Sequence, residues 1–300
     1  MDSKRKYTTY YSSSRSRQVL ASNRPNNKKR LVYLACTVLI VLTGYVMFFG
    51  DSDKPQSKAQ PAPSVPAFTL DSASLDQSIN AILQTIPKNI QTSVAVVDLT
   101  NQKSYSYGTQ ASFDSASVAK VVTATLFLHK VEQGEYSLSE KFGTETASEQ
   151  LKAMIEDSDN TAWKLFNDEL THPELDAWAR QNGMTSYTSD KNQMTSNDMA
   201  SLLQKLYAKK LLSEQNTNLL LSHMKVSENS LISQYAPAGA TVYRKAGWLS
   251  DRYHEATIVD NGKHPYVLVI FSKTSAEVYP SGTGKGMYKS IVDVTTRLFQ

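Results

Sequence analysis

The stretch FDSASVAK, residues 113–120, is the most informative part of this sequence for both the fold and the chemistry. It lies where an extended segment gives way to the strongly helical continuation VVTA. A helix brings residues three apart onto one face, so the Lys120 amine can reach the Ser117 hydroxyl. The positive end of the helix favours negative charge that develops at Ser117. The flanking valines predict a buried lysine, whose lowered pKa would let it act as the base for the serine.

The Ser-x-x-Lys spacing alone is a weak signal, because it recurs at Ser3–Lys6 and at Ser222–Lys225. Two further motifs change its meaning. Ser158–Asn160 (SDN) occurs once, between two helical stretches, and Lys245–Gly247 (KAG) ends a predicted strand. Taken singly, the first reads as a helix cap and the second as an ordinary strand end. Together and in this order, the motifs predict one chemical site.

The three motifs resemble the S-x-x-K, S-D-N and K-T-G motifs of the penicillin-binding proteins and class A β-lactamases. Residues 113–120 are similar to the F-x-x-A-S-x-x-K form, and residues 158–162 to the S-D-N-T-A form. The resemblance covers about residues 70–300. It implies a serine hydrolase that forms an acyl-enzyme with β-lactams or D-Ala-D-Ala-like wall peptides.

The resemblance implies three catalytic residues. Ser117 would attack a carbonyl carbon and become acylated, and Lys120 would be its base. Ser158 would relay a proton to the leaving nitrogen. No cofactor is expected.

The resemblance also implies a substrate-binding set. Asn160 would hold the substrate's side-chain amide, and Lys245 would support Ser158 and the substrate carboxylate electrostatically. The backbone N–H groups of Ser117 and of Trp248, which follows Gly247, would form the oxyanion hole.

One departure from the family concerns deacylation. Class A β-lactamases carry a glutamate that activates the deacylating water, but no glutamate lies between Asn182 and Asp198. Glu174, in PELD, imitates the family's E-P-E-L-N sequence but follows Asn160 too soon and reads as a first helical turn. It and Asp190 are the weak candidates for a deacylating base. The sequence therefore predicts an acyl-enzyme that persists.

A second departure is Ala246, which replaces the Thr or Ser whose hydroxyl would bind the substrate carboxylate; Arg252 is a candidate to compensate. These departures keep two alternatives open. One is a catalytically degenerate domain that binds cell-wall fragments or a protein partner. The other is an esterase that shares only the fold.

Helical and strand periodicities predict an α+β fold. The expected assembly is a five-stranded, mostly antiparallel sheet flanked by terminal helices, with an inserted all-helical lobe, as in β-lactamases and transpeptidases. Helices are predicted at 71–86 and 285–299, strands at 93–99, 103–107, 241–246, 255–259 and 266–271, and the helical block at about 113–235.

The first quarter of the chain reads as a membrane anchor. Residues 1–30 hold nine Lys or Arg against one acid, and residues 31–50 carry no charge over twenty positions. Such a run spans about 30 Å of hydrocarbon, and the positive-inside rule places the basic tail in the cytoplasm. Residues 51–66 read as a linker, and 67–300 as an extracytoplasmic catalytic domain. A cleaved signal peptide, or a lipoprotein site at Cys36, are the rival interpretations.

Other features have ordinary interpretations. The basic charge belongs to the tail, so no nucleic-acid partner is predicted. The five histidines show no metal-ligand pairing, and His254 is expected to open a strand. Residues 281–286 (SGTGKG) do not fit a phosphate loop and are expected to form a loop before the last helix. No oligomeric state is predicted.

Overall fold

The computed structural model describes residues 68–227 and 230–300. The predicted tail 1–30, membrane span 31–50 and linker 51–66 lie outside these residues. Within the described part, no helix has both the length and the apolar character needed to cross a bilayer.

Nine α-helices, nine strands and one 3₁₀ turn make up the described residues. In chain order they are α1 (Ser72–Gln84), β1 (Ile90–Asp98), β2 (Lys103–Gly108), β3 (Phe113–Asp114), η1 (Ala116–Ala119), α2 (Lys120–Glu132), β4 (Lys141–Phe142), β5 (Glu145–Thr146), α3 (Ala147–Glu156), α4 (Asn160–Leu170), α5 (His172–Gln181), β6 (Gln193–Met194), α6 (Ser196–Tyr207), α7 (Glu214–Val226), α8 (Leu231–Tyr235), β7 (Thr241–Leu249), β8 (Arg252–Asp260), β9 (Tyr266–Thr274) and α9 (Ser281–Leu298).

The main sheet has the strand order β2-β1-β9-β8-β7, and every neighbouring pair is antiparallel. Strands from both ends of the sequence meet where β1 pairs with β9, from Ile90 opposite Thr274 to Asp98 opposite Tyr266. This confirms the five-stranded antiparallel sheet that the sequence predicted. The strand β7 forms one edge.

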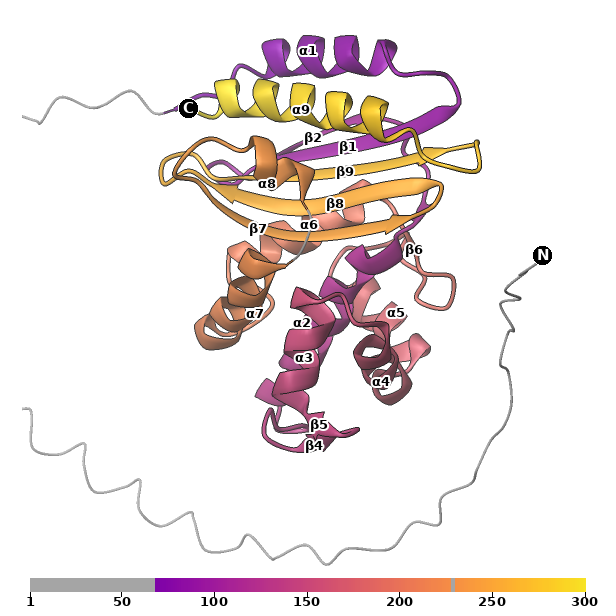
Figure 1. Cartoon of the computed structure of the whole chain (residues 1–300). Helices are drawn as coiled ribbons and strands as arrows, with labels where there is room; N and C mark the ends of the chain where they lie inside the picture. The colour runs from indigo at the N-terminus through magenta and orange to yellow at the C-terminus, as the bar shows by residue number, and fades with distance from the viewer. Residues whose placement is uncertain (1–67, 228–229) are drawn as a thin grey trace, which may run out of the picture. The chain divides into compact units, whose positions relative to one another are not determined.

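Helices cover both faces of the sheet (Figure 1). Successive side chains of a strand point to opposite faces. Val94 and Val96 of β1 therefore belong to the core beneath α1 and α9, whereas Ala95 and Val97 belong to the core shared with the helical lobe. A strand buried on both faces needs apolar residues throughout, which explains the run VAVV in β1.

The helical lobe is built around α2, whose residues are buried almost without interruption. Phe127 of α2 packs edge-on against Phe166 of α4, with the ring centroids 4.6 Å apart. Neighbouring helices thus hold α2 on several sides. The turn η1, which carries the predicted nucleophile, leads directly into this buried helix.

The lobe that was predicted to be all-helical also holds two short antiparallel strand pairs, β3–β6 and β4–β5, so that prediction was wrong in part. Three further elements differ from the sequence-based expectations. The strand β7 continues to Leu249, so Lys245–Gly247 lies inside a strand and not at its end. Residues 281–286 form the first turns of α9 and not a loop. Within these turns Gly284 packs against Tyr279, whose Cε1 would lie 2.6 Å from an added Cβ. The short helix α8 had no periodic signal long enough to predict.

Candidate active site

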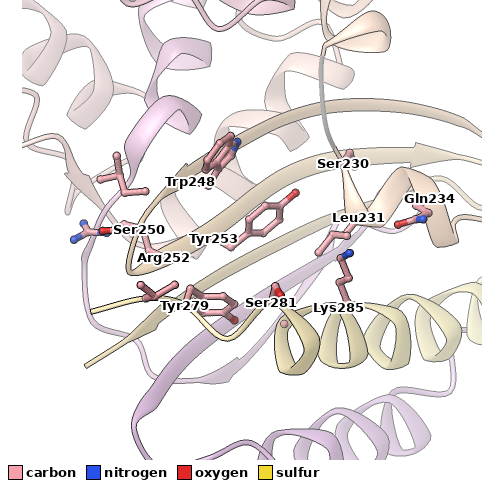
Figure 2. Close-up of a pocket in the computed structure, with 13 residues that line it drawn as sticks. Ser230, Leu231, Gln234, Trp248, Ser250, Arg252, Tyr253, Tyr279, Ser281 and Lys285 are labelled. Atoms are coloured by element: carbon pink, nitrogen blue, oxygen red, sulfur yellow. The ribbon is translucent and has the colours of Figure 1, made fainter. Parts of the chain in front are cut away.

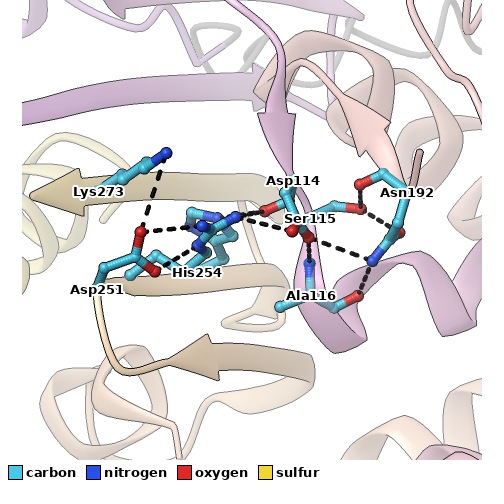
Figure 3. Close-up of polar contacts among 8 residues, drawn as sticks. Asp114, Ser115, Ala116, Asn192, Asp251, His254 and Lys273 are labelled. Carbon is cyan, nitrogen blue, oxygen red and sulfur yellow. Dashed lines mark hydrogen bonds and ion pairs between the residues drawn. The ribbon is translucent and has the colours of Figure 1, made fainter. Parts of the chain in front are cut away.

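The predicted nucleophile sits in a constrained turn. Ser117 lies in η1, directly after Ala116, whose φ of 48° is in the left-handed region that alanine seldom adopts. The side-chain amide of Asn192 donates to the Ala116 carbonyl (3.0 Å), and the Ser115 hydroxyl donates to Asn192 Oδ1 (2.7 Å). These bonds, drawn in Figure 3, hold the strained backbone in place.

Lys120 is fully buried beneath Ser117. Its Nζ lies 2.9 Å from Ser117 Oγ, 2.6 Å from the Ser158 carbonyl oxygen and 2.7 Å from Asn160 Oδ1. The last two atoms can only accept a hydrogen bond, whereas the serine hydroxyl can donate one. A neutral amine has two N–H donors and one lone pair, so it satisfies all three neighbours if the Ser117 hydroxyl donates to it.

The environment of Lys120 favours that neutral form. Burial and, to a smaller extent, the positive charge of Lys245 lower the pKa of Lys120 to about 7, although the negative charge of Asp159 acts in the opposite direction. The Trp163 ring, with its centroid 5.1 Å from Nζ, lies where it attracts a charged amine, so this contact acts against the lowering of the pKa. At neutral pH a large share of the molecules therefore carries an uncharged amine beside the serine.

The second motif presents a hydroxyl to both lysines. Ser158 has a φ of 59°, and its Oγ lies 3.3 Å from Lys120 Nζ and 3.0 Å from Lys245 Nζ. Asp159 begins α4 by accepting a hydrogen bond from the Ala162 N–H at 2.7 Å. The aspartate of the motif is thus a helix cap, as the sequence predicted for this motif taken singly. Ser158 and Asn160 flank the cap.

The third motif brings the edge strand against the nucleophile. A Cβ on Gly247 would lie 2.7 Å from the Ser117 nitrogen and 2.9 Å from the Val118 nitrogen, so only glycine fits. The next residue, Trp248, leaves 61% of its surface exposed. The close approach places the β7 backbone directly beside η1.

These residues enclose one cavity of about 240 Å³. It is lined by Ser117, Asp157, Ser158, Asn160, Lys245, Ala246, Gly247 and Trp248. Lys120 lies beneath it and contacts three of these residues. The structure thus brings all seven predicted residues together, although they come from three separate parts of the sequence.

The candidate deacylating bases lie elsewhere. Glu174 pairs with Lys130, with the carboxylate oxygen and the amine 2.5 Å apart, and Asp190 is exposed in the segment between α5 and β6. Neither lines the cavity. The one carboxylate among the lining residues is Asp157, which the sequence analysis did not single out.

Arg252, the candidate to compensate for Ala246, does not line the cavity either. Its guanidinium pairs with Asp114 at 2.9 Å and with Asp251 at 2.8 Å. Asp114 precedes the nucleophile turn, so these ion pairs tie the turn to the β7–β8 hairpin.

His254 supports the same turn from below and was not predicted to do so. Its Nε2 lies 3.0 Å from the Asp114 carbonyl oxygen (Figure 3). Its Nδ1 accepts a hydrogen bond from the Ser272 N–H at 3.1 Å. Burial lowers the pKa of His254 to about 4, so the ring is neutral, with its proton on Nε2. Neither His254 nor Asn192 belongs to a motif, and no signal in the sequence pairs either with residues 113–117.

Comparisons with known proteins bear on the family and on the fold. The family model described as the β-lactamase enzyme family matches residues 74–293. The solved structure of PBP-A is 20% identical and covers 79% of this chain and 99% of its own, with a TM-score of 0.68. A PBP-A mutant in an acyl-enzyme complex with penicillin G is also 20% identical, covering 78% and 100% with a TM-score of 0.68. A β-lactamase from Sphaerobacter thermophilus is 16% identical, covering 76% and 97% with a TM-score of 0.66. No curated protein matches the sequence.

Proposed function

The chain belongs to the β-lactamase enzyme family, and we propose that it is a serine hydrolase whose Ser117 is acylated by β-lactams or D-Ala-D-Ala-like wall peptides. The observation that carries the proposal is the buried amine of Lys120, 2.9 Å from the Ser117 hydroxyl, with a pKa lowered to about 7. A serine hydroxyl needs such a base in order to attack at neutral pH.

The acylation step follows from the contacts. Neutral Lys120 takes the Ser117 proton while Oγ bonds to the carbonyl carbon. The N–H groups of Ser117 and Trp248 stabilise the oxygen that becomes negative. When the carbonyl carbon–nitrogen bond breaks, the nitrogen receives a proton from Ser158, which is replenished by Lys120 at 3.3 Å. The positive charge of Lys245, 3.0 Å from Ser158 Oγ, stabilises the negative charge that develops on this oxygen when it gives up its proton.

We further propose that the acyl group leaves slowly. Hydrolysis of the ester needs a base that activates water, and Glu174 is held away by Lys130. Each protein molecule would then react with one β-lactam molecule and stay acylated, as a penicillin-binding protein does.

The location of the domain is part of the proposal. The uncharged run 31–50 behind a basic tail supports a single membrane anchor, with residues 67–300 outside the cytoplasm. Wall peptides and β-lactams would both be encountered there.

Mass spectrometry of the full chain in an uncharged detergent tests these steps. After incubation with penicillin G we expect one covalent adduct, mapped to Ser117, that decays over hours. Ser117→Ala should give none, and Glu174→Gln should leave the decay rate unchanged. If penicillin and other activated acyl reagents all fail to label the protein, the degenerate binding domain is the better reading. Ester turnover without penicillin labelling would favour the esterase.

A further inference from the structure

A second, larger cavity lies next to the catalytic one. It measures about 610 Å³, within the usual range for small-molecule sites, and is formed by the β7–β8 hairpin, α8 and the start of α9 (Figure 2). Trp248 lines both cavities. Its cross-strand partner Tyr253, on β8, is partly buried and packs against the core beneath α1 and α9.

The walls of this cavity are apolar and exposed. Four large hydrophobic residues in the described part of the chain are exposed, and three of them line this cavity: Trp248, Leu249 (48%) and Val278 (68%). Leu231 and Tyr279 extend the same surface. Exposed apolar residues gathered around a hollow are costly to leave in water and mark a place where a ligand binds.

The charge of the cavity is positive. Its lining residues include Arg252 and Lys285 but no Asp or Glu. Arg252 is already neutralised by Asp114 and Asp251. Lys285 forms no ion pair with the described residues, so its charge remains available. The helix α9 starts beside it at Ser281, without a side-chain cap on its first N–H groups.

We propose that this cavity binds an amphiphilic monoanion: a small molecule with an aromatic or aliphatic body that packs between Trp248 and Val278, and a carboxylate that reaches Lys285. Apolar burial supplies affinity, and the charge-assisted bond to the ammonium orients the ligand. The two cavities share Trp248, but the proposed binding does not depend on acylation of Ser117.

Photo-crosslinking tests the proposal on the full chain in an uncharged detergent. The probe is benzophenone-4-carboxylate, and its neutral control is benzophenone-4-carboxamide. We expect crosslinks in peptides that contain Leu231 or Val278. Val278→Asp, at an exposed position, should lower labelling by both probes at least tenfold, whereas Val226→Asp, at an exposed position outside the cavity, should not.

A second pair of variants tests the preference of the cavity for an anion. Lys285→Gln should weaken saturable labelling by the carboxylate about tenfold and leave the carboxamide unaffected, because a charge-assisted hydrogen bond is lost. Lys289→Gln, one turn further along α9, is the matched control. Carboxylate labelling that is unchanged in Lys285→Gln, or that falls by the same factor as carboxamide labelling, would overturn the anionic class. Crosslinks confined to peptides containing Ser117 or Ser158, or no saturable labelling, would overturn the site.

Discussion

Gly247 and Ser117 touch through their backbones. A side chain at position 247 would begin 2.7 Å from the Ser117 nitrogen, and that nitrogen cannot move without moving the nucleophile. The edge strand β7 can therefore pack this closely against the catalytic turn only while residue 247 is glycine. In the proposed mechanism this contact sets the spacing of the two oxyanion-binding N–H groups.

We expect Gly247→Ala to reduce the rate of acylation by penicillin by about 10²–10³-fold, the usual loss when one oxyanion donor is displaced. Stopped-flow or quenched-flow labelling measures this rate. Gly286→Ala is the control, because nothing lies within 4 Å of an added Cβ there and the residue is helical. That variant should acylate normally and gain about 0.5–1 kcal/mol of stability. Normal acylation of Gly247→Ala would contradict the proposed oxyanion hole.

The acylation rate should rise with pH, with a midpoint near the Lys120 pKa of about 7. Below that pH the amine is protonated and cannot accept the Ser117 proton; above it the base is free. A pH–rate profile from about 5 to 9 measures this midpoint. Because Glu255 also has a pKa near 7, Glu255→Gln is the control and should keep the midpoint. A flat profile would exclude Lys120 as the base.

Asn192 is expected to act by positioning the nucleophile turn. Its φ of 50° is left-handed, so Asn192→Gly keeps the backbone favourable while removing the two side-chain bonds, one to the Ala116 carbonyl and one from the Ser115 hydroxyl. The bonds from Ser115 to the Asn192 backbone carbonyl remain. We expect acylation to slow about 30-fold, because the two lost bonds together contribute about 2 kcal/mol and about 1.4 kcal/mol corresponds to a factor of ten. Lys209→Gly, at another left-handed position with φ 56°, should leave the rate unchanged. Equal rates in both variants would remove the positioning role.

Glu255 should make the stability of the domain depend on pH. Burial raises the pKa of Glu255 to about 7, although the Ser230 hydroxyl and the Leu231 and Ile232 N–H groups favour its charged form. A carboxyl whose folded pKa exceeds its unfolded value near 4.5 is most favourable to folding at low pH. Its contribution falls as the pH rises from about 4.5 and levels off above about 7, a loss of about 3 kcal/mol.

Urea unfolding of the wild type and of Glu255→Gln between pH 5 and 8.5 measures this dependence. The difference in unfolding free energy between the two proteins should change across that range, with the variant gaining relative to the wild type. A constant difference would mean that Glu255 keeps one protonation state throughout.

The local elements of the fold could be read from the sequence because their causes are local. The spacing of Ser117 and Lys120 determines that they share a helix face, and the unbroken apolar runs in β1 and β9 are typical of buried strands. Asp159 caps α4 with atoms only three residues away. The order of the three motifs was also enough to predict that Ser117, Ser158 and Lys245 meet.

What only the tertiary structure decided are contacts between residues far apart in the sequence. Asn192 and His254 hold the nucleophile turn across 77 and 140 positions of sequence, and no periodic pattern encodes such a pairing. Glu174 could be assigned to Lys130 only once α2 and α5 were packed together. The lowered pKa of Lys120 depends on the water that the folded lobe excludes and on Lys245, far along the chain. Burial and long-range charge are properties of the assembled fold. The sequence therefore identifies the reacting groups, whereas the packing determines their protonation state and the contacts that hold them in position.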